Sequence, residues 1–596
     1  GESSISGLFN NTGTVQVKAG TLTLYSGGTN TGSFSIDAGS TLNITGNADY
    51  NFNTGTNITG VGNFVVSYVT VKIVPAFNYS GAVFVHNWGN LDIGAASTLS
   101  APVNVTAGGN LTGTGALTIS NQLNWSESTL SGSGKKTVSG TLTLSGYQTL
   151  NGTTLETSGA TVWTGTGYLN GANNAIWNNT STGTIDLQSD ADFYYYSNAT
   201  FNNAGTLTKS NGITTDESYV GLIFNNTGTV QVKKGTLNLS GGGSNSGAFS
   251  IDSGATLKIS GYYNTYNFDT GNSITGAGNF NIESGTVTVN APSTWSSPVN
   301  LTGGNLTGTG ALTISNKLNW SESTLSGSGK KTVSGTLNLS GYQTLDGTTL
   351  ETTGTTVWTG NGTLYAANAA MWNNTSTGTI DLQGDADFYQ WTGNQTTFNN
   401  TGTLIKSNGT TTGESYISGL FNNTGTVQVK AGTLNLNGGG TNTGSFSIDA
   451  GSTLKITADY NFNTGNSVTG AGNFNLESVT VTVNAASTWS APVNLTSGTI
   501  TGTGALTISN KLNWSGGTLS GTGKKTVSGT LNLSGGHLLG GTTLETTGTT
   551  IWTGNGTLYT ATEQFGTIPA LALLTYKMML IFINGMEIYP PSIMPE

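Results

Sequence analysis

The ten-residue stretch FNNTGTVQVK, Phe9–Lys18, decides the fold we expect, because it recurs intact at Phe224 and at Phe421. Within it, Val15 and Val17 flank a polar Gln16, and Asn-Thr-Gly precedes them as a turn signal. Alternation of apolar and polar residues after such a turn indicates a short, half-buried strand. Self-similarity at a fixed spacing indicates a repeat architecture. The chain therefore reads as a series of short strands copied many times.

A second marker, KKTVSGTL, sets the length of the long repeat. It begins at Lys135, Lys330 and Lys524, so consecutive copies lie roughly 195 residues apart. The FNNTGTVQVK copies at Phe9 and Phe224 lie farther apart, because the first long copy carries about 20 additional residues within residues 65–101. We expect long repeats over about 1–215, 216–412 and 413–560, the third truncated, in one continuous fold.

A shorter repeat lies inside each long copy. Asn-Asn dipeptides follow Trp177, Phe201 and Phe224 at nearly equal spacings, and together with other matches they give a unit of about 19–26 residues. The insertion is close to one such unit, as stacked repeats allow when they gain a whole layer. Each unit holds two or three short strands separated by Gly, Asn, Ser and Asp turns.

This pattern predicts an all-β fold, a right-handed parallel β-helix (β-solenoid) with coils of about 19–26 residues. About 560 residues would form on the order of 25 coils, with Asn side chains stacked into ladders between coils. A run of β-sandwiches is the alternative, but domains of about 100 residues fit the long period less naturally than a whole number of coils does.

Composition narrows the classes of function. Of 596 residues, 90 are Gly, none is Cys and only 8% are charged; the net charge is −10, and every one of the 18 basic residues is Lys. Nucleic-acid binding needs a basic surface, so we expect none. Without Cys there is no disulfide framework and no thiolate metal site.

The motifs NNTGTV, GTLNLSGGG and GTGALTISN resemble repeat tracts of very large bacterial surface and secreted proteins: filamentous-haemagglutinin-like adhesins and autotransporter passenger domains. The resemblance covers about residues 4–560 and rests on repeat style. It implies a right-handed β-helix displayed outside the cell, and it carries over no site residues. Because secretion segments of those proteins are not recognisable here, we expect an internal segment of a longer chain.

The strongest acidic pattern is DLQSDAD, copied as DLQGDAD. Carboxylates two and four positions apart could gather around Ca²⁺, a cation that prefers oxygen ligands. The weak Ca²⁺ candidates are Asp186, Asp190, Asp192, Asp381, Asp385 and Asp387. Alternatively they are solvated turns, or a paired-carboxylate site of a polysaccharide-acting enzyme. We expect no other cofactor and no catalytic residues.

Aromatic clusters are the better indication of binding, because exposed rings offer flat apolar faces to sugars. FYYY at Phe193 corresponds to FYQW at Phe388, and Asn-Trp-Ser recurs at Trp125, Trp320 and Trp514. The alternative is that these rings fill the core. The ligand-binding candidates are Tyr194, Tyr195, Tyr196, Tyr389 and Trp391.

The three Lys pairs and His537 are the remaining polar features of the repeats. The Lys pair that opens each KKTVSGTL copy is expected to be a solubilising turn, or else a contact for an anionic glycan or cell surface. His537 stands where the earlier copies have Gln148 and Gln343, without a His or Cys companion in the sequence, so we expect no metal site there.

The last segment, 561–596, departs from the repeat. Residues 568–583 are mostly apolar but short for a membrane span, which needs about 20 residues, so we expect a cap, an anchor or a sequence artefact. We expect a non-enzymatic, extracellular or cell-surface structural protein, an adhesive rod or stalk. Its expected partners are glycans, surface or matrix components, or sister molecules in filaments. A polysaccharide lyase or glycosidase, or a carbohydrate-binding module, is the alternative.

Overall fold

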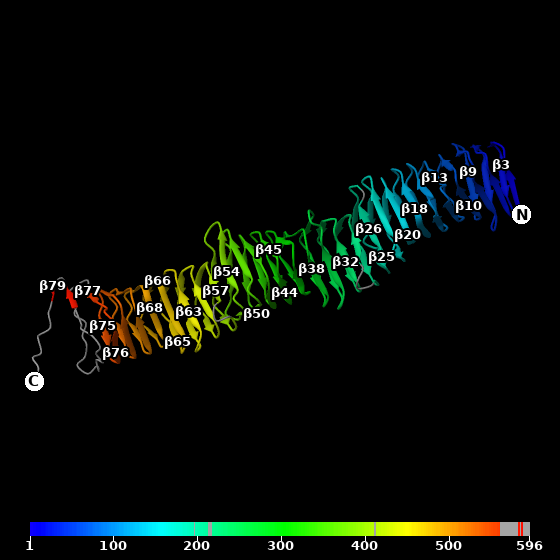
Figure 1. Ribbon diagram of the computed structural model, residues 1–596. Helices are drawn as coiled ribbons and strands as arrows, with labels where there is room; N and C mark the ends of the chain where they lie inside the picture. Colours follow the sequence, from blue (N-terminus) through cyan, green and yellow to red (C-terminus); the bar gives the residue numbers. More distant parts are fainter. Residues whose placement is uncertain (196, 213–216, 410–412, 561–581, 585, 588–596) are drawn as a thin grey trace, which may run out of the picture. The chain divides into compact units, whose positions relative to one another are not determined.

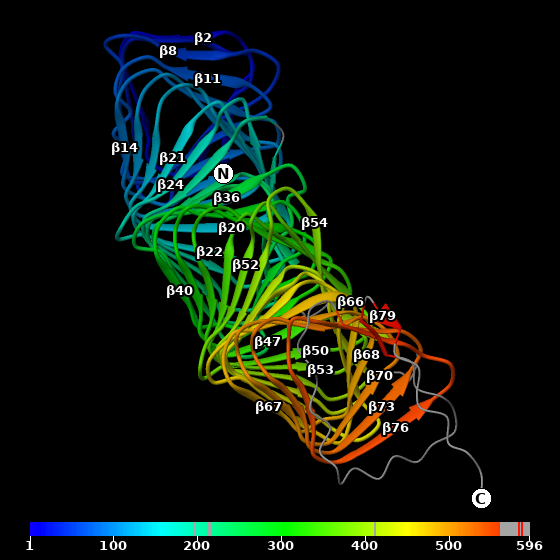
Figure 2. The ribbon, with the colours of Figure 1, turned by 90° about the vertical axis from the view of Figure 1, so that its left-hand side faces the viewer.

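The computed structural model describes residues 1–195, 197–212, 217–409, 413–560, 582–584 and 586–587, without the side chains of Tyr195 and of the residues after 560. The described residues are all-β with no helix, and their parallel stacked coils form a β-solenoid of about 28 turns. The chain divides into two compact units, Gly1–Asn300 (unit 1) and Leu301–Glu596 (unit 2). Figures 1 and 2 show the successive coils of each unit lying one beside the next. The predicted parallel β-solenoid is confirmed.

Three parallel ladders run through unit 1, one for each side of a coil. Two long strands, β18 (Gln122–Ser131) and β20 (Thr141–Asn151), turn a corner and belong to ladders 1A and 1B. Ladder 1A contains β1 (Glu2–Ile5), β4 (Thr21–Leu24), β7 (Thr41–Ile44), β10 (Asn63–Ser67), β12 (Val83–His86), β15 (Val103–Val105), β22 (Ala160–Trp163), β25 (Thr184–Leu187), β28 (Thr206–Lys209) and β31 (Thr229–Val232). Ladder 1B contains β2 (Phe9–Asn11), β5 (Gly28–Asn30), β8 (Tyr50–Phe52), β11 (Thr70–Ile73), β13 (Asn90–Ile93), β16 (Asn110–Thr112), β23 (Tyr168–Ala172), β26 (Asp192–Tyr195), β29 (Glu217–Val220) and β32 (Thr236–Leu239). Ladder 1C contains β3 (Thr14–Val17), β6 (Ser33–Ile36), β9 (Asn57–Gly60), then β14 (Ser97–Leu99), β17 (Leu117–Ile119), β19 (Lys136–Val138), β21 (Thr154–Thr157), β24 (Ile176–Asn179), β27 (Thr200–Asn203), β30 (Ile223–Asn226) and β33 (Gly243–Asn245).

Unit 2 repeats this arrangement in three ladders of its own. Ladder 2A contains β45 (Ser323–Ser326), β48 (Gln343–Asp346), β51 (Thr363–Ala367), β54 (Asp387–Thr392), β57 (Glu414–Ile417) and β60 (Thr433–Leu436). Ladder 2B contains β46 (Lys331–Val333), β49 (Thr349–Thr352), β52 (Met371–Asn374), β55 (Thr397–Asn400), β58 (Leu420–Asn423) and β61 (Gly440–Asn442), and ends with β71 (Thr518–Ser520), β74 (His537–Gly540) and β77 (Leu558–Thr560). Ladder 2C contains β44 (Lys317–Trp320), β47 (Thr336–Leu339), β50 (Thr355–Trp358), β53 (Thr379–Leu382) and β56 (Thr403–Lys406), and ends with β69 (Leu506–Ile508), β72 (Lys525–Val527) and β75 (Leu544–Thr546). After Thr560 the described residues form β78 (Phe582–Asn584) and β79 (Met586–Glu587); the rest of the expected cap, anchor or artefact lies outside the described residues.

The strands follow the alternation read from the sequence. In β31, Val230 and Val232 are buried, whereas Thr229 and Gln231 are partly exposed. β-Branched residues suit such a pleated, half-buried surface. Because each coil shares its core with its two neighbours, 35% hydrophobic residues suffice to fill the interior.

The predicted Asn ladders are present. In unit 1 the Asn179 amide donates to Asn203 Oδ1 at 2.7 Å, and Asn203 donates to Asn226 Oδ1 at the same distance. Unit 2 has a matching ladder through Asn374, Asn400 and Asn423, with donor–acceptor distances of 2.8 Å. These buried amides satisfy one another between coils, as buried polar groups must.

A glycine at one corner shows why this residue is so frequent. A Cβ built on Gly335 would lie 1.6 Å from the backbone oxygen of Asn316 in the adjacent coil. Only a residue without a side chain permits coils to approach this closely.

The insertion of the first copy is one whole coil. Phe64 N–H donates to Ala82 O, and Val83 N–H donates in turn to Pro102 O, whereas Phe280 N–H in the second copy donates directly to Pro298 O. Residues 65–101 therefore hold one coil more than the matching segment of the second copy.

The expectation that the long repeat holds a whole number of coils is wrong. In unit 1, Phe9 lies in ladder 1B while its copy Phe224 lies in ladder 1C. In unit 2, Lys331 lies in ladder 2B while its copy Lys525 lies in ladder 2C. The repeat therefore contains a whole number of coils plus one third, so copied segments within a unit face different directions.

Most coils fall within the expected range of lengths, but two are longer. Asp192 and Tyr219 of adjacent strands are 27 residues apart, and Asp387 and Tyr416 are 29 apart. Both long coils follow the DLQ-type acidic motifs, where the connection between strands contains more residues.

Candidate functional site

The acidic motifs hold the corners before the two long connections. Asp190 forms a salt bridge of 2.8 Å with Lys209, whose side chain is fully buried, and Lys209 Nζ also donates to the backbone oxygens of Ser189 and Asn211. In unit 2, Asp385 and Lys406 repeat this pair at 3.0 Å. A buried ammonium needs such a complete set of acceptors, so these two Asp residues anchor the corners.

The remaining Asp residues have separate protein partners. Asp192 and Asp387 accept the backbone N–H of Tyr219 and Tyr416 at 2.8 and 2.9 Å. Burial raises the pKa of both carboxyls above the ordinary value. Asp186 and Asp381 accept a hydrogen bond from the Gln two positions later, each at 2.9 Å. Among the described residues, no group of three or more His, Cys, Asp or Glu is arranged to hold a metal ion; Ca²⁺ binding stays a prediction.

A row of exposed aromatic rings lies along ladder 1B in unit 1. The centroids of Tyr147 and Tyr168 are 4.6 Å apart, and those of Tyr168 and Tyr194 are 5.1 Å apart. Tyr147 and Tyr194 are exposed, while Tyr168 is half-buried. The Asp192 carboxylate is the main cause that raises the pKa of Tyr194. Candidate Tyr196 and the side chain of Tyr195 lie outside the described residues.

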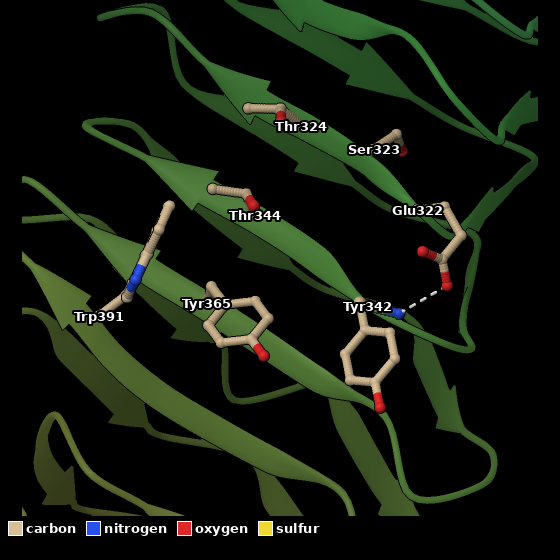
Figure 3. Close-up of a pocket in the computed structure, with 7 residues that line it drawn as sticks. All are labelled: Glu322, Ser323, Thr324, Tyr342, Thr344, Tyr365 and Trp391. Carbon is tan, nitrogen blue, oxygen red and sulfur yellow. Dashed lines mark hydrogen bonds between the residues drawn. The ribbon is translucent and has the colours of Figure 1, made fainter.

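In unit 2, three aromatic rings surround a groove of about 450 Å³ on ladder 2A (Figure 3). Its lining residues are Glu322, Ser323, Thr324, Tyr342, Thr344, Tyr365 and Trp391. The Tyr365 ring lies 6.3 Å from that of Tyr342 and 5.8 Å from that of Trp391, measured between centroids. We call this set the aromatic groove.

Strand register explains how the groove forms. Thr324, Thr344 and Tyr365 are paired neighbours in three successive strands, so their side chains project from the same side of the ladder. The pairing of β51 with β54 shifts between Ala366 and Ala367, which leaves Trp391 as an extra residue in a bulge. Bulges redirect side chains, and here the bulge brings Trp391 to Tyr365. At the groove's other end, Tyr342 N–H donates to Glu322 Oε1 at 3.1 Å.

Both long copies have a cluster of rings at the same position of the repeat, but different residues supply the rings. Tyr168 of the first copy aligns with Thr363, and Tyr365 of the second aligns with Asn170. Both positions point outward from the same strand, two positions apart, so either can carry the ring.

Of the ligand-binding candidates predicted from the sequence, Trp391 lines the aromatic groove. Tyr194, Tyr389 and Trp391 are exposed as expected, and Tyr389 lies 6.1 Å from Tyr365 between ring centroids. Tyr147, Tyr168, Tyr342 and Tyr365 were missed. The repeated Gly-Tyr-Gln at Gly146 and Gly341 is the signal that could have identified two of them.

The Asn-Trp-Ser tryptophans are not binding residues. Trp125, Trp320 and Trp514 are each no more than 1% exposed, so they fill the core, the alternative given above. Trp125 and Trp320 donate their indole N–H to the backbone oxygens of Ser128 and Ser323, which satisfies the buried polar atom.

Only the first Lys of each pair is exposed, as expected for a solubilising turn. The first Lys of each pair is exposed and bridges a Glu: Lys135–Glu156 at 3.0 Å, with Lys330–Glu351 and Lys524–Glu545 at 2.8 Å. The second Lys is buried, and its ammonium donates to backbone oxygens, as Lys136 does to Gly134 at 2.7 Å. Burial lowers the pKa of Lys136, Lys331 and Lys525 to about 8. These buried lysines can reach neither a glycan nor solvent.

His537 is also buried, at 2% exposure, with its ring 4.7 Å from that of Trp514 between centroids. Neither ring nitrogen has a hydrogen-bond partner among the described residues, and burial lowers its pKa. It is a core residue, and no His, Cys or carboxylate cluster surrounds it in the described part of the chain.

No known protein family, no curated protein and no solved structure matches this chain. Within the described residues there is no helix long and apolar enough to cross a membrane.

Proposed function

We propose that this chain is a non-enzymatic structural repeat protein of the cell surface or extracellular space, an adhesive stalk whose aromatic groove binds a neutral glycan. The observation that supports it is the groove itself: three aromatic rings, two Thr hydroxyls and one carboxylate on a regular ladder. Its volume is in the range of small-ligand sites. The resemblance of the repeats to bacterial surface proteins agrees with this proposal.

The chemistry of the lining favours a sugar. Tyr342, Tyr365 and Trp391 offer apolar ring faces, and Thr324 and Thr344 can donate hydrogen bonds to hydroxyl groups or accept them. The carboxylate of Glu322 accepts hydrogen bonds and repels anionic groups. With a net charge of −10, the chain favours a neutral glycan over a polyanion.

The groove is less suited to hydrolysis. Glycosidases use two carboxyl groups on either side of the scissile bond. Among the described residues that line the groove, Glu322 is the single carboxylate, and it already accepts the Tyr342 N–H. Binding is therefore the better-supported role.

The backbone supports the structural part of the proposal. Hydrogen-bonded ladders run from coil to coil in each unit, and buried Asn amides pair between coils. Such stacking gives each repeat stability through its neighbours, which suits a protease-resistant spacer outside the cell.

Isothermal titration of the full chain with cellohexaose, chitohexaose and hyaluronan tests the groove. We expect a neutral hexaose to bind, and Trp391→Ala or Tyr342→Ala to weaken it at least tenfold, as for aromatic hot spots. Tyr263→Ala is the matched control, because Tyr263 is 93% exposed but does not line the groove. Absence of binding by all three probes would refute glycan recognition, and new reducing ends or unsaturated products would refute the non-enzymatic role.

A further inference from the structure

The 65–101 region of the first copy, which holds one additional coil, carries two exposed aromatic residues that neither the core nor the aromatic groove explains. Tyr68 is 61% exposed and Trp88 is 77% exposed. Both lie at the corner between ladders 1A and 1B, Tyr68 between β10 and β11 and Trp88 between β12 and β13. The second and third copies have one coil fewer in this region and no aromatic residue at the matching corner.

Trp88 is exposed but held in place. Its backbone has a φ of 63°, in the left-handed region, and its N–H donates to Ala107 O at 3.3 Å. A Cβ built on Gly108 would lie 2.9 to 3.2 Å from three atoms of the indole ring. The ring therefore rests on the glycine backbone of the next coil, where any other residue would push it away. An aromatic surface fixed in this way loses little freedom when a ligand binds.

The same corner continues from coil to coil towards the ring row already described. Tyr68 N–H donates to Asn87 O at 2.9 Å, next to Trp88, and Gly108 N–H donates to Glu127 O at 2.6 Å. A Cβ built on Gly146 would lie 3.2 Å from Glu127 Cγ, and Tyr147 follows directly. Exposed Glu127 therefore fills the corner between Trp88 and the rings of Tyr147, Tyr168 and Tyr194.

These residues define the corner track of unit 1. Six consecutive coils carry Tyr68, Trp88, Gly108, Glu127, Tyr147 and Tyr168 at this corner. In the seventh coil Asp192 pairs with Tyr168, and Tyr194, two residues farther along the strand, supplies the ring. At about 4.8 Å per coil, it extends over about 29 Å. The rise of one coil is close to the length of one sugar in an extended chain. The track therefore presents rings at sugar-like intervals, and Glu127 supplies a hydrogen-bond acceptor where no ring is present.

We propose that the corner track binds an extended, neutral, β-linked polysaccharide lying along the stack of coils, with Tyr68 and Trp88 forming additional sugar subsites. Sugars with equatorial substituents have the flat apolar faces that exposed rings contact. Glu127 and Asp192 at the same corner disfavour an anionic chain. This inference rests on the proposed function, since it takes the same class of ligand, but it uses residues of unit 1 that are separate from the aromatic groove.

Acrylamide quenching of tryptophan fluorescence tests this on the full chain. Nine of the 12 Trp side chains are fully buried and Trp552 is partly buried, whereas Trp88 and Trp391 are exposed. The variant Trp391→Phe leaves Trp88 as the exposed reporter, and Trp88→Phe leaves Trp391; the double variant supplies the background.

With cellohexaose or chitohexaose as the probe, we expect Trp88 in the Trp391→Phe chain to be quenched at least twofold less. Adding Tyr68→Ala to the Trp391→Phe chain should weaken the affinity for the protecting hexaose at least fivefold, while adding Tyr263→Ala should leave it unchanged. Protection of Trp391 in Trp88→Phe, without protection of Trp88 in Trp391→Phe, would overturn the corner track and leave the groove. Protection at neither position, by either probe, would overturn both proposals.

Discussion

Replacing His537 by Gln is expected to stabilise the last coils of unit 2. At the equivalent place in the preceding copy, Gln343 Nε2 donates to the backbone oxygen of Trp320 at 3.1 Å and also to that of Ser340. His537 is equally buried and occupies the matching position of its copy, but both its ring nitrogens lack a partner among the described residues. The substitution should restore the two donor contacts, to Trp514 O and Ser534 O.

The size of the effect follows from those contacts. Two hydrogen bonds at about 0.5–1.5 kcal/mol each contribute about 1–3 kcal/mol. The Gln oxygen is unpaired in the earlier copies, but His537 already has unpaired ring nitrogens, so this cost is common to both side chains and we expect a net gain of about 1–2 kcal/mol. This corresponds to roughly a 5- to 30-fold change in a folding equilibrium. Hydrogen-exchange protection of β71, β74 and β77 should rise by that factor, because exchange reports local opening.

The pH dependence gives a second readout. Burial lowers the pKa of His537 below its ordinary value of 6.5. As the pH falls below about 6.5, the opened state therefore takes up a proton that the folded state does not, and stability is lost. The variant should lose this dependence. The reverse change, Gln343→His, is the matched control and should destabilise β48 and introduce acid sensitivity there. Unchanged or lower protection in His537→Gln, or acid sensitivity that persists in it, would refute the reasoning.

Three further changes test the solenoid interior. Asn203→Ala interrupts a buried amide ladder and leaves the neighbouring amides unpaired, so it should lower the stability by about 2–3 kcal/mol. The loss should appear as weaker hydrogen-exchange protection in β24 and β30. An unaltered exchange pattern would show that the ladder is dispensable. Burial lowers the pKa of Lys331 to about 8. Between about pH 8 and 10.5 this side chain is therefore protonated in the unfolded state but not in the folded state, so the stability of the protein should rise with pH across that range. Denaturation midpoints measured against pH should show a smaller slope in Lys331→Met than in the unchanged chain, and an identical slope would contradict this. Lys406→Met removes the ammonium that faces buried Asp385 and should lower the stability by about 3–5 kcal/mol. Adding Asp385→Asn to that variant should recover part of the loss. Equal proteolytic lifetimes of the 384–409 segment in the unchanged chain, the single variant and the double variant would argue against a stabilising role for this pair.

Much of the fold follows from the sequence, because the coil is a local, repeated solution. The Val15-Gln-Val17 alternation, the turn residues and the Asn-Asn spacing predicted parallel coils, stacked amides and a one-coil insertion, all of which the structure contains. Coil number was underestimated, at about 25 against about 28, because many coils are at the short end of the predicted range, such as the 19-residue step from Asn226 to Asn245.

The direction of individual side chains was less predictable. A Lys-Lys pair looks solvated in sequence, yet Lys331 points inward, because alternate strand residues face opposite sides and its neighbour Lys330 takes the outward position. The Asn-Trp-Ser triplets contain two polar residues and one aromatic residue. Which residues of the strand face the core is set by its pairing in the ladder, and this pairing, not the triplet itself, buries Trp320.

The sequence by itself determined that this chain is a repeated β-coil with few charged and no thiol groups. Only the tertiary structure decided where its surface features meet. Tyr342 and Tyr365 are well separated along the chain and become neighbours because they lie in successive coils. Likewise, the additional third of a coil in each long repeat turns copied segments onto different sides within a unit. The length of the repeat can be counted in the sequence. Which residues share a corner depends on the number of residues in each coil, in its strands and its loops together, and this number is fixed only when the backbone ladders pair.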